Sequence, residues 1–311
     1  MADYTIKDIR NIALISHAGS GKTSFAEAIV YNAGASNRFG KVDDGTSVSD
    51  YSEDEIERKV SISASVLSFK HSNKRINIID SPGYADFMGE MLSSLNAVDS
   101  AVLLVDAHDG IQVGTEKTWS MASDIGLSRV IFLNKLDKDN VNFYAVVDSI
   151  RERFGKSCVL VNMPIGTGPD FKGVIDLLSV EDRHACPLPD GEDKEKAIEL
   201  RNSLIEAIAE KNDELLEKYL EGKELSPEEI KIGFRKAVIS RELFPIYCGS
   251  ATLNIGIKEL MSNMFDMLPS PLDMKARKAK DPDTNHDKEL KPGGTGNFSG
   301  FVFKTVSDPY V

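Results

Sequence analysis

The segment that most constrains this chain lies near its N-terminus, where residues 16–23 read Ser-His-Ala-Gly-Ser-Gly-Lys-Thr. The apolar run Ile12 to Ile15 precedes it, and Phe25 and Ile29 follow four residues apart, so the context is strand, glycine-rich loop, helix. Glycine lets backbone N–H groups converge on phosphate oxygens, and the helix N-terminus adds partial positive charge. We predict a phosphate-binding loop whose nucleotide contacts come from Ala18, Gly19, Ser20, Gly21, Lys22, Thr23 and Ser24.

Two side chains of this loop carry the chemistry. The Lys22 ammonium would reach the β- and γ-phosphates and act as a catalytic charge, and the Thr23 hydroxyl would ligate Mg²⁺. Ser16 stands where the usual pattern has glycine, so the match is imperfect. The alternative is a glycine-rich helix start in which Lys22 is a surface charge.

Short apolar runs alternate with amphipathic stretches through the first half of the chain. Phe87, Met91 and Leu95 share one helical face, as do Phe143, Val147, Ile150 and Phe154. The alternation predicts an α/β fold of the P-loop NTPase class, with a mainly parallel sheet covered by helices on both faces. Ligands then bind beyond the carboxyl ends of the strands. The predicted strands are Ile12–Ile15, Val66–Phe69, Ile76–Ile79, Ala101–Val105, Val130–Leu133, Val159–Val161 and Phe244–Cys248.

Three further loops follow predicted strands. In residues 80–83, Asp-Ser-Pro-Gly, Asp80 would hold Mg²⁺ through a water, and the Gly83 amide would contact the γ-phosphate. Taken alone, this pattern is a common turn. In residues 248–251, Cys-Gly-Ser-Ala, small side chains would let backbone N–H groups at Ser250 and Ala251 approach a base carbonyl.

The loop at residues 134–137, Asn-Lys-Leu-Asp, predicts which base is bound. The Asp137 carboxylate would accept hydrogen bonds from guanine N1–H and the N2 amine, whereas adenine would leave this charge unpaired. Lys135 would lie over the ring, and Asn134 would tie this loop to the phosphate loop. The alternative is a helix N-cap at Asp139 or Asn140 after a charged turn. Together the four loops predict a GTP or GDP site with Mg²⁺.

The remaining chain divides into an insertion, a linker and a last segment. Residues 166–243 break the alternation; Phe171–Leu178 reads as a strand and Lys194–Leu220 as a charged helical stretch with Ile205, Ala209, Leu216 and Leu220 as its apolar stripe. Residues 190–229 hold 14 acids and 6 bases, which favours a solvated face or a docking surface for a basic partner. Ile257–Leu268 reads as a helix, residues 269–296 as an exposed linker, and a strand is expected from Phe301 to Val311.

Composition limits the classes of protein that remain. Asp plus Glu exceed Lys plus Arg by 49 − 37 = 12, which disfavours a long-range electrostatic grip on nucleic acid or on an anionic membrane. The three cysteines, Cys158, Cys186 and Cys248, are too few and scattered for a disulfide scaffold or zinc ribbon. No apolar run can span a bilayer and no signal peptide is evident, so we expect a soluble cytoplasmic protein.

The motifs resemble those of the translational GTPases, and within them the elongation factor G family. The resemblance extends to residues 134–143 (NKLDKDNVNF), 170–177 (DFKGVIDL) and 268–271 (LPSP). It implies a GTP-binding domain over 1–268 with an inserted α+β subdomain at about 166–243. It also implies that 297–311, whose last four residues resemble the start of the family's β-barrel domain, begin a second domain of a longer factor. The implied partner of the intact factor, otherwise monomeric and without a membrane role, is the ribosome, through its RNA and stalk proteins.

Residues 50–63 resemble the family's first switch, with Lys59 and Ser61 where the family has Gly and Thr. Ser61 keeps a hydroxyl for Mg²⁺; the alternative is a flexible acidic loop before nucleotide binds. Gly19 replaces an acid that helps to hold a monovalent cation in the family. Tyr84 replaces the family's catalytic His, and a phenol is a neutral donor near neutral pH whereas an imidazole also carries charge. Tyr84 is therefore a weak catalytic candidate beside Lys22 and Gly83, and we interpret His17 as structural.

These observations leave two functions open. The first is an enzyme in which ordered switches and Mg²⁺ promote attack of water on the γ-phosphate. The second is a GTP-dependent switch or ribosome-binding factor with little or no hydrolysis. A P-loop kinase of small substrates would need adenine selectivity, against which residues 134–137 argue. Translocation, recycling, protection and regulation of ribosomes are not distinguished by these residues.

Overall fold

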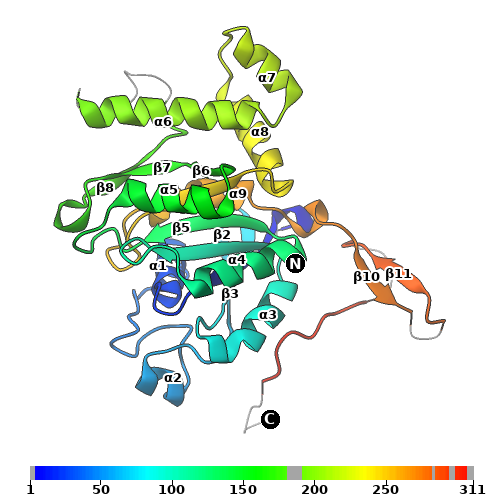
Figure 1. Cartoon of the computed structure of the whole chain (residues 1–311). Coiled ribbons are helices and arrows are strands. Elements are labelled where there is room, and N and C mark those ends of the chain that lie inside the picture. The colour runs from blue at the N-terminus through cyan, green and yellow to red at the C-terminus, as the bar shows by residue number, and fades with distance from the viewer. Residues whose placement is uncertain (1–3, 181–190, 282–283, 294–297, 307–311) are drawn as a thin grey trace.

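The computed structural model (Figure 1) describes residues 4–180, 191–281, 284–293 and 298–306. Its centre is a seven-stranded sheet of order β2-β3-β1-β4-β5-β9-β6. Neighbouring strands are parallel except for the antiparallel pair β2–β3. The predicted α/β class with a mainly parallel sheet is confirmed. The strands are β1 (Ile9–Ser16), β2 (Ser65–His71), β3 (Lys74–Asp80), β4 (Ser100–Asp106), β5 (Ser128–Asn134), β6 (Cys158–Leu160) and β9 (Phe244–Cys248).

Burial explains why these runs form strands. Every residue of β4 and of β5 is buried, as expected for central parallel strands that are covered on both faces. The edge strand β2 instead alternates buried and exposed positions, and a two-residue turn joins it to β3. Both turn residues, Ser72 and Asn73, have positive φ (47° and 62°), the geometry of a tight β-hairpin.

The helices that pack on this sheet follow the predicted apolar faces. Met91 and Leu95 are buried on α3, and Phe143, Val147 and Ile150 are buried on α5. Helix α1 contacts α9, and α3 contacts α4. These helices are α1 (Lys22–Asn32), α3 (Met88–Asn96), α4 (Val113–Ile125), α5 (Phe143–Phe154) and α9 (Ile257–Met267). The short helix α2 (Glu53–Arg58) lies away from the sheet at the bottom of Figure 1.

The chain between β6 and β9 forms a hairpin followed by three helices. The hairpin pairs β7 (Asn162–Ile165) with β8 (Gly173–Asp176), which is shorter than the strand predicted over 171–178. The helices α6 (Glu192–Ala209), α7 (Asp213–Leu220) and α8 (Pro227–Ile239) lie together at the top of Figure 1, away from α1, α2 and α3.

The predicted charged helix over 194–220 is wrong in one respect, because the chain breaks between α6 and α7. The Asn212 side chain accepts a hydrogen bond from Leu215 N at 3.1 Å and starts a new helix with a new phase. Ile205 and Ala209 are buried as predicted, but Leu215 is the buried residue of α7, and Leu220 is 76% exposed.

The expected linker contains structure of its own. Strands β10 (Arg277–Lys280) and β11 (Asp287–Leu290) form an antiparallel hairpin that projects from the body in Figure 1. Oppositely charged residues are register partners across it, with Lys278 opposite Glu289 and Lys280 opposite Asp287. Such cross-strand neighbours favour a hairpin in this polar segment.

The strand expected after Phe301 is not formed in residues 298–306, which carry no regular secondary structure. Most of this segment is exposed, but Phe303 packs on the main core and Lys304 Nζ donates a hydrogen bond to Ala64 O. A lone strand has no neighbour to complete its hydrogen bonds, which accounts for the difference. Residues 307–311, with the Asp308–Val311 motif, lie outside the described residues. The proposed boundaries at 268 and 296 stay predictions.

Candidate nucleotide-binding site

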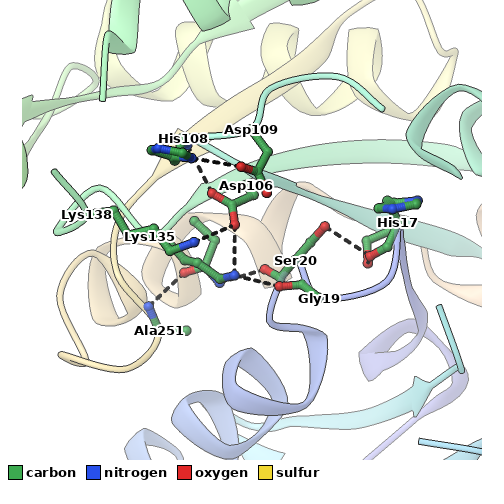
Figure 2. Close-up of polar contacts among 11 residues, drawn as sticks. His17, Gly19, Ser20, Asp106, His108, Asp109, Lys135, Lys138 and Ala251 are labelled. Atoms are coloured by element: carbon green, nitrogen blue, oxygen red, sulfur yellow. Dashed lines mark hydrogen bonds and ion pairs between the residues drawn. The ribbon is translucent and has the colours of Figure 1, made fainter. Parts of the chain in front are cut away.

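The glycine-rich loop connects β1 to α1 as predicted. Gly19 and Gly21 have φ of 79° and 89°, a left-handed backbone that favours glycine. At Gly21 space is also limiting, because a Cβ there would lie 2.5 Å from Asn134 Nδ2. The Ser20 hydroxyl donates to His17 O at 3.0 Å and closes the loop, as Figure 2 shows. The loop is therefore shaped by its own residues and by the neighbouring loop at residues 134–138, called the base loop below.

The side chain of Lys22 is buried under this loop. Its ammonium donates to Ser16 Oγ at 2.8 Å, so the serine that departs from the usual pattern supplies an acceptor. Burial lowers the pKa of Lys22 to about 8, and the charges of Asp80 and Asp50 oppose this shift. A cation held beneath a glycine-rich loop, with a neutral hydroxyl as its acceptor, is placed to bind an anion.

The three predicted metal ligands converge although they lie far apart in the sequence. Thr23 Oγ1 donates to Asp80 Oδ2 at 3.0 Å, and Ser61 Oγ lies 3.0 Å from Thr23 Oγ1. Ser49 Oγ donates to the same Asp80 oxygen at 3.0 Å. The arrangement gathers hydroxyl and carboxylate oxygens, which are the donors that Mg²⁺ prefers.

A second carboxylate, which the sequence reasoning left without a role, joins this cluster. Asp50 is 5% exposed, and its Oδ2 and Asp80 Oδ1 have no hydrogen-bond partner among the described residues. Burial raises the pKa of Asp80 to about 6; Lys22 opposes this and the charge of Asp50 adds to it. Burial likewise raises the pKa of Asp50. Two buried, unpaired carboxylate oxygens beside two hydroxyls fit a divalent cation such as Mg²⁺.

Two buried glutamates hold residues 50–63, which resemble the first switch, and the chain just before them. Glu55 accepts hydrogen bonds from Ile62 N at 2.9 Å and Ser63 N at 3.1 Å, the two residues that follow Ser61. Glu27 of α1, 1% exposed, accepts from Ser47 Oγ at 3.0 Å and Gly40 N at 3.2 Å. Glu55 thus ties the segment to itself, and Glu27 ties the residues before it to α1. Ser61 contacts Thr23 of α1, so the segment is held in this structure rather than a free acidic loop.

Lys59, where the resembled family has glycine, adopts φ of 54° at the end of α2. The free-energy cost of this left-handed conformation is larger for lysine than for glycine, which is a physical reason why the resembled family has glycine at this position.

The loop after β3 lies against the phosphate loop. A Cβ on Gly83 would lie 3.0 Å from Ala18 Cα and closer still to Lys22 Nζ, so only glycine fits without movement. Tyr84 follows at the N-cap of a 3₁₀ turn (Ala85–Phe87) and is 46% exposed. The structure places the predicted Gly83 amide beside the phosphate loop and leaves Tyr84 half in solvent.

The base loop is connected to two other loops through Asn134. Its Nδ2 donates to Ser20 O at 2.9 Å, and its Oδ1 accepts from Ala251 N at 2.9 Å. The predicted tie between the base loop and the phosphate loop is confirmed. The Ala251 amide, expected to approach a base carbonyl, is bonded to Asn134, so a base carbonyl at this position would share it. Ser250 N donates to Ile255 O at 3.0 Å.

Lys135 and Asp137 occupy the same loop but differ in their partners. Lys135 Nζ donates to Gly19 O at 2.5 Å and to Asp106 Oδ2 at 2.8 Å, as seen in Figure 2. Asp137 Oδ1 is buried and has no hydrogen-bond partner in the part of the chain that the structure describes. A buried carboxylate oxygen without a partner can accept a hydrogen bond from a ligand.

Two comparisons with known proteins bear on this site. The sequence profile described as the elongation factor Tu GTP binding domain matches residues 7–270. A crystal structure of a protein from Thermus thermophilus superposes with a TM-score of 0.79 at 34% identity, covering 86% of this chain and 41% of that chain. The chain therefore spans less than half the length of this similar protein. Separately, none of the helices in the described residues has the length and apolarity to cross a membrane.

Proposed function

Because the chain belongs to the elongation factor Tu GTP-binding domain family, we propose that it binds GTP and GDP with Mg²⁺ at the four convergent loops. The resemblance to elongation factor G-like translational GTPases is confirmed by the family match over residues 7–270 and by the superposed structure. We further assign the chain to a longer, ribosome-associated factor in which GTP hydrolysis drives a conformational switch.

The unpaired Asp137 carboxylate is the observation that carries the choice of base. Its Oδ1 is buried without a partner among the described residues, so a ligand with N–H donors removes a desolvation cost. Guanine presents two such donors, whereas adenine presents an acceptor at N1 and would meet the carboxylate with repulsion. Titration calorimetry of the chain with GDP, GTP and ATP tests this. ATP binding as tightly as GDP would exclude the guanine site.

The phosphate side supplies charge where the triphosphate would lie. Thr23, Ser61 and Asp80, with Asp50 beside them, would hold Mg²⁺, which when bound would neutralise charge on the β- and γ-phosphates. Lys22 would exchange its bond to the Ser16 hydroxyl for a phosphate oxygen. The Gly83 amide, close to Ala18 and Lys22, would contact the γ-phosphate. Each group stabilises negative charge, as a loose phosphoryl-transfer transition state requires.

Hydrolysis is the part of this proposal that depends most on Tyr84. A positioned general acid or base is worth about 10²–10⁴-fold in rate, and the Tyr84 side chain is 46% exposed. The second candidate function, a GTP-dependent switch with slow hydrolysis, follows from this exposure. Phosphate release by the intact protein, with and without ribosomes, separates the two. Ribosome-stimulated release supports the enzyme, and nucleotide-dependent ribosome binding without release supports the switch.

The partners follow from the family and not from any surface described above. We propose the ribosome, through its RNA and its stalk proteins, as the partner of a monomeric cytoplasmic factor. Co-sedimentation of the intact protein with ribosomes in GTP, GDP and no nucleotide tests this. Equal sedimentation in all three conditions would contradict a nucleotide-controlled interaction.

A further inference from the structure

A buried carboxylate outside the four motifs lies directly behind the base loop. Asp106 is the last residue of β4, and its side chain is 5% exposed. Figure 2 shows it between His108 on one side and the two lysines of the base loop on the other. Its Oδ1 accepts a hydrogen bond from His108 N at 3.0 Å, which orients the carboxylate from its own loop. The other oxygen, Oδ2, is left for the lysines.

Both lysines that flank Asp137 bind this one oxygen. Lys135 Nζ lies 2.8 Å and Lys138 Nζ lies 3.3 Å from Asp106 Oδ2. Lys135 also donates to Gly19 O in the phosphate loop at 2.5 Å. One carboxylate thus fixes the chain two residues before Asp137 and one residue after it, and Lys135 also joins it to the phosphate loop.

Backbone hydrogen bonds make this arrangement stiff. Ala107 N donates to Asn134 O at 2.8 Å, so the end of β4 and the end of β5 are held together next to the carboxylate. Lys138 N donates to Lys135 O at 3.1 Å and closes the turn that contains Asp137. Asp137 itself has a buried oxygen without a partner among the described residues. Its position is set by its neighbours rather than by a bond to that oxygen.

The carboxylate is ionised in this setting. Burial disfavours the charge, but the hydrogen bonds from Lys135 and His108 N and the charges of Lys135 and Lys138 outweigh it and lower the pKa of Asp106. An asparagine at position 106 would keep the shape of the side chain but lose the electrostatic attraction for the ammonium groups of Lys135 and Lys138.

We propose that Asp106 is a specificity-positioning residue: by holding Lys135 and Lys138 it places the Asp137 carboxylate against the N2 amine and N1–H of a guanine base. This rests on the proposed guanine-nucleotide site and adds a residue that never touches the nucleotide. Its effect falls on discrimination between bases. Hypoxanthine, which lacks the N2 amine, forms one fewer hydrogen bond with Asp137 and therefore loses less when Asp137 is misplaced.

The test compares GDP with inosine diphosphate in the full 311-residue chain by titration calorimetry. In Asp106→Asn we expect GDP affinity to fall about tenfold, the size of a hydrogen bond to a charged group, and inosine diphosphate affinity to fall about twofold. The ratio of the two affinities then drops about fivefold. Asp109→Asn is the matched control, since Asp109 lies three residues further on and pairs with His108 on the surface; its ratio stays at the wild-type value.

A second variant keeps the test decisive if Asp106→Asn folds poorly. Lys138 is 43% exposed, so Lys138→Met leaves the core intact while it removes one of the two anchors. We expect a drop of about twofold to threefold in the same ratio. An unchanged ratio in folded Asp106→Asn, or in Lys138→Met where that variant alone is folded, overturns the positioning role even if overall affinity falls. A wild-type chain that binds ATP as well as GDP overturns the guanine site itself, and with it this inference.

Discussion

The two halves of the nucleotide site differ in how their charges are paired. On the base side, Asp106 binds Lys135 and Lys138, Lys135 and Asn134 bind the phosphate loop, and Asp137 keeps an open oxygen. On the phosphate side, Asp50 and Asp80 each keep a buried oxygen without a partner among the described residues. The Lys22 ammonium there has a serine hydroxyl as its acceptor. The base side is assembled before a ligand arrives, whereas the phosphate side needs ligand charge to be complete.

The largest expected effect tests whether the Lys22 ammonium binds the phosphates of the nucleotide. Lys22→Met keeps much of the side-chain volume and removes the charge, so GTP loses charge-assisted contacts to its β- and γ-phosphates, whereas GDP loses only the contact to its β-phosphate. At about 2 kcal/mol for each contact, we expect GTP affinity to fall about a thousandfold and GDP affinity about thirtyfold. Fluorescent-nucleotide titration measures both affinities.

The matched control for that change is Lys117→Met, an exposed lysine on α4. This control should bind as the wild type does. Wild-type affinity in Lys22→Met would show that the buried ammonium is a structural charge, and the contrast between the two halves of the site would fail.

The next effect concerns Tyr84, which the phosphate side leaves 46% exposed. In Tyr84→His, an imidazole can orient and polarise the attacking water, so ribosome-stimulated phosphate release by the intact protein should rise by about a hundredfold. Nucleotide affinity should not change, because the base side is untouched. Tyr84→Phe serves as the control for loss of the hydroxyl alone. Equal phosphate release by the wild type and Tyr84→His would show that tyrosine at position 84 does not slow hydrolysis.

The base side is tested at its open oxygen. Asp137→Asn replaces an acceptor by an amide, which repels the guanine N–H groups with its own and can instead pair with the C2 carbonyl of xanthine. We expect GDP affinity to fall about thirtyfold, or about 2 kcal/mol, and xanthosine diphosphate affinity to rise. Displacement titration with both nucleotides measures the switch. A loss of affinity for both would indicate damage to the loop rather than a change of base.

The parts of the site that were predicted from the sequence share one property: each motif is local. The loops at 16–23, 80–83, 134–137 and 248–251 follow β1, β3, β5 and β9, and parallel strands bring their carboxyl ends to one edge. A local pattern plus this rule is enough to place them together.

The residues that the sequence did not single out act over long separations. Glu27 contacts Ser47, and Asp106 at the end of β4 contacts Lys135 after β5. Neither pair has a spacing in the sequence that would predict the contact. Helix α8, in contrast, begins with a capping box at Ser226 and has Pro227 at its first position. This local pattern indicates a helix start, but it was not used to predict the insertion. The phase of α7 was missed because a cap at Asn212 restarts the helix.

The smallest expected effect is a change in thermal stability, which should have opposite signs for a substitution on the phosphate side and for one on the base side. Asp50 is 5% exposed; burial raises its pKa, and the charge of Glu55 adds to this shift. Asp50→Asn removes a buried charge, one oxygen of which has no hydrogen-bond partner among the described residues, so the nucleotide-free protein in EDTA should gain about 1 kcal/mol, or about 2 °C in Tm. Asp106→Asn removes a paired charge and should lower Tm. With Mg²⁺ and GTP present, Asp50→Asn should lose this advantage, because the cation then pairs the wild-type carboxylate. Thermal denaturation of the three proteins with and without Mg²⁺–GTP measures both signs, and a lower Tm for Asp50→Asn in EDTA would mean that the phosphate side is already complete without its ligand.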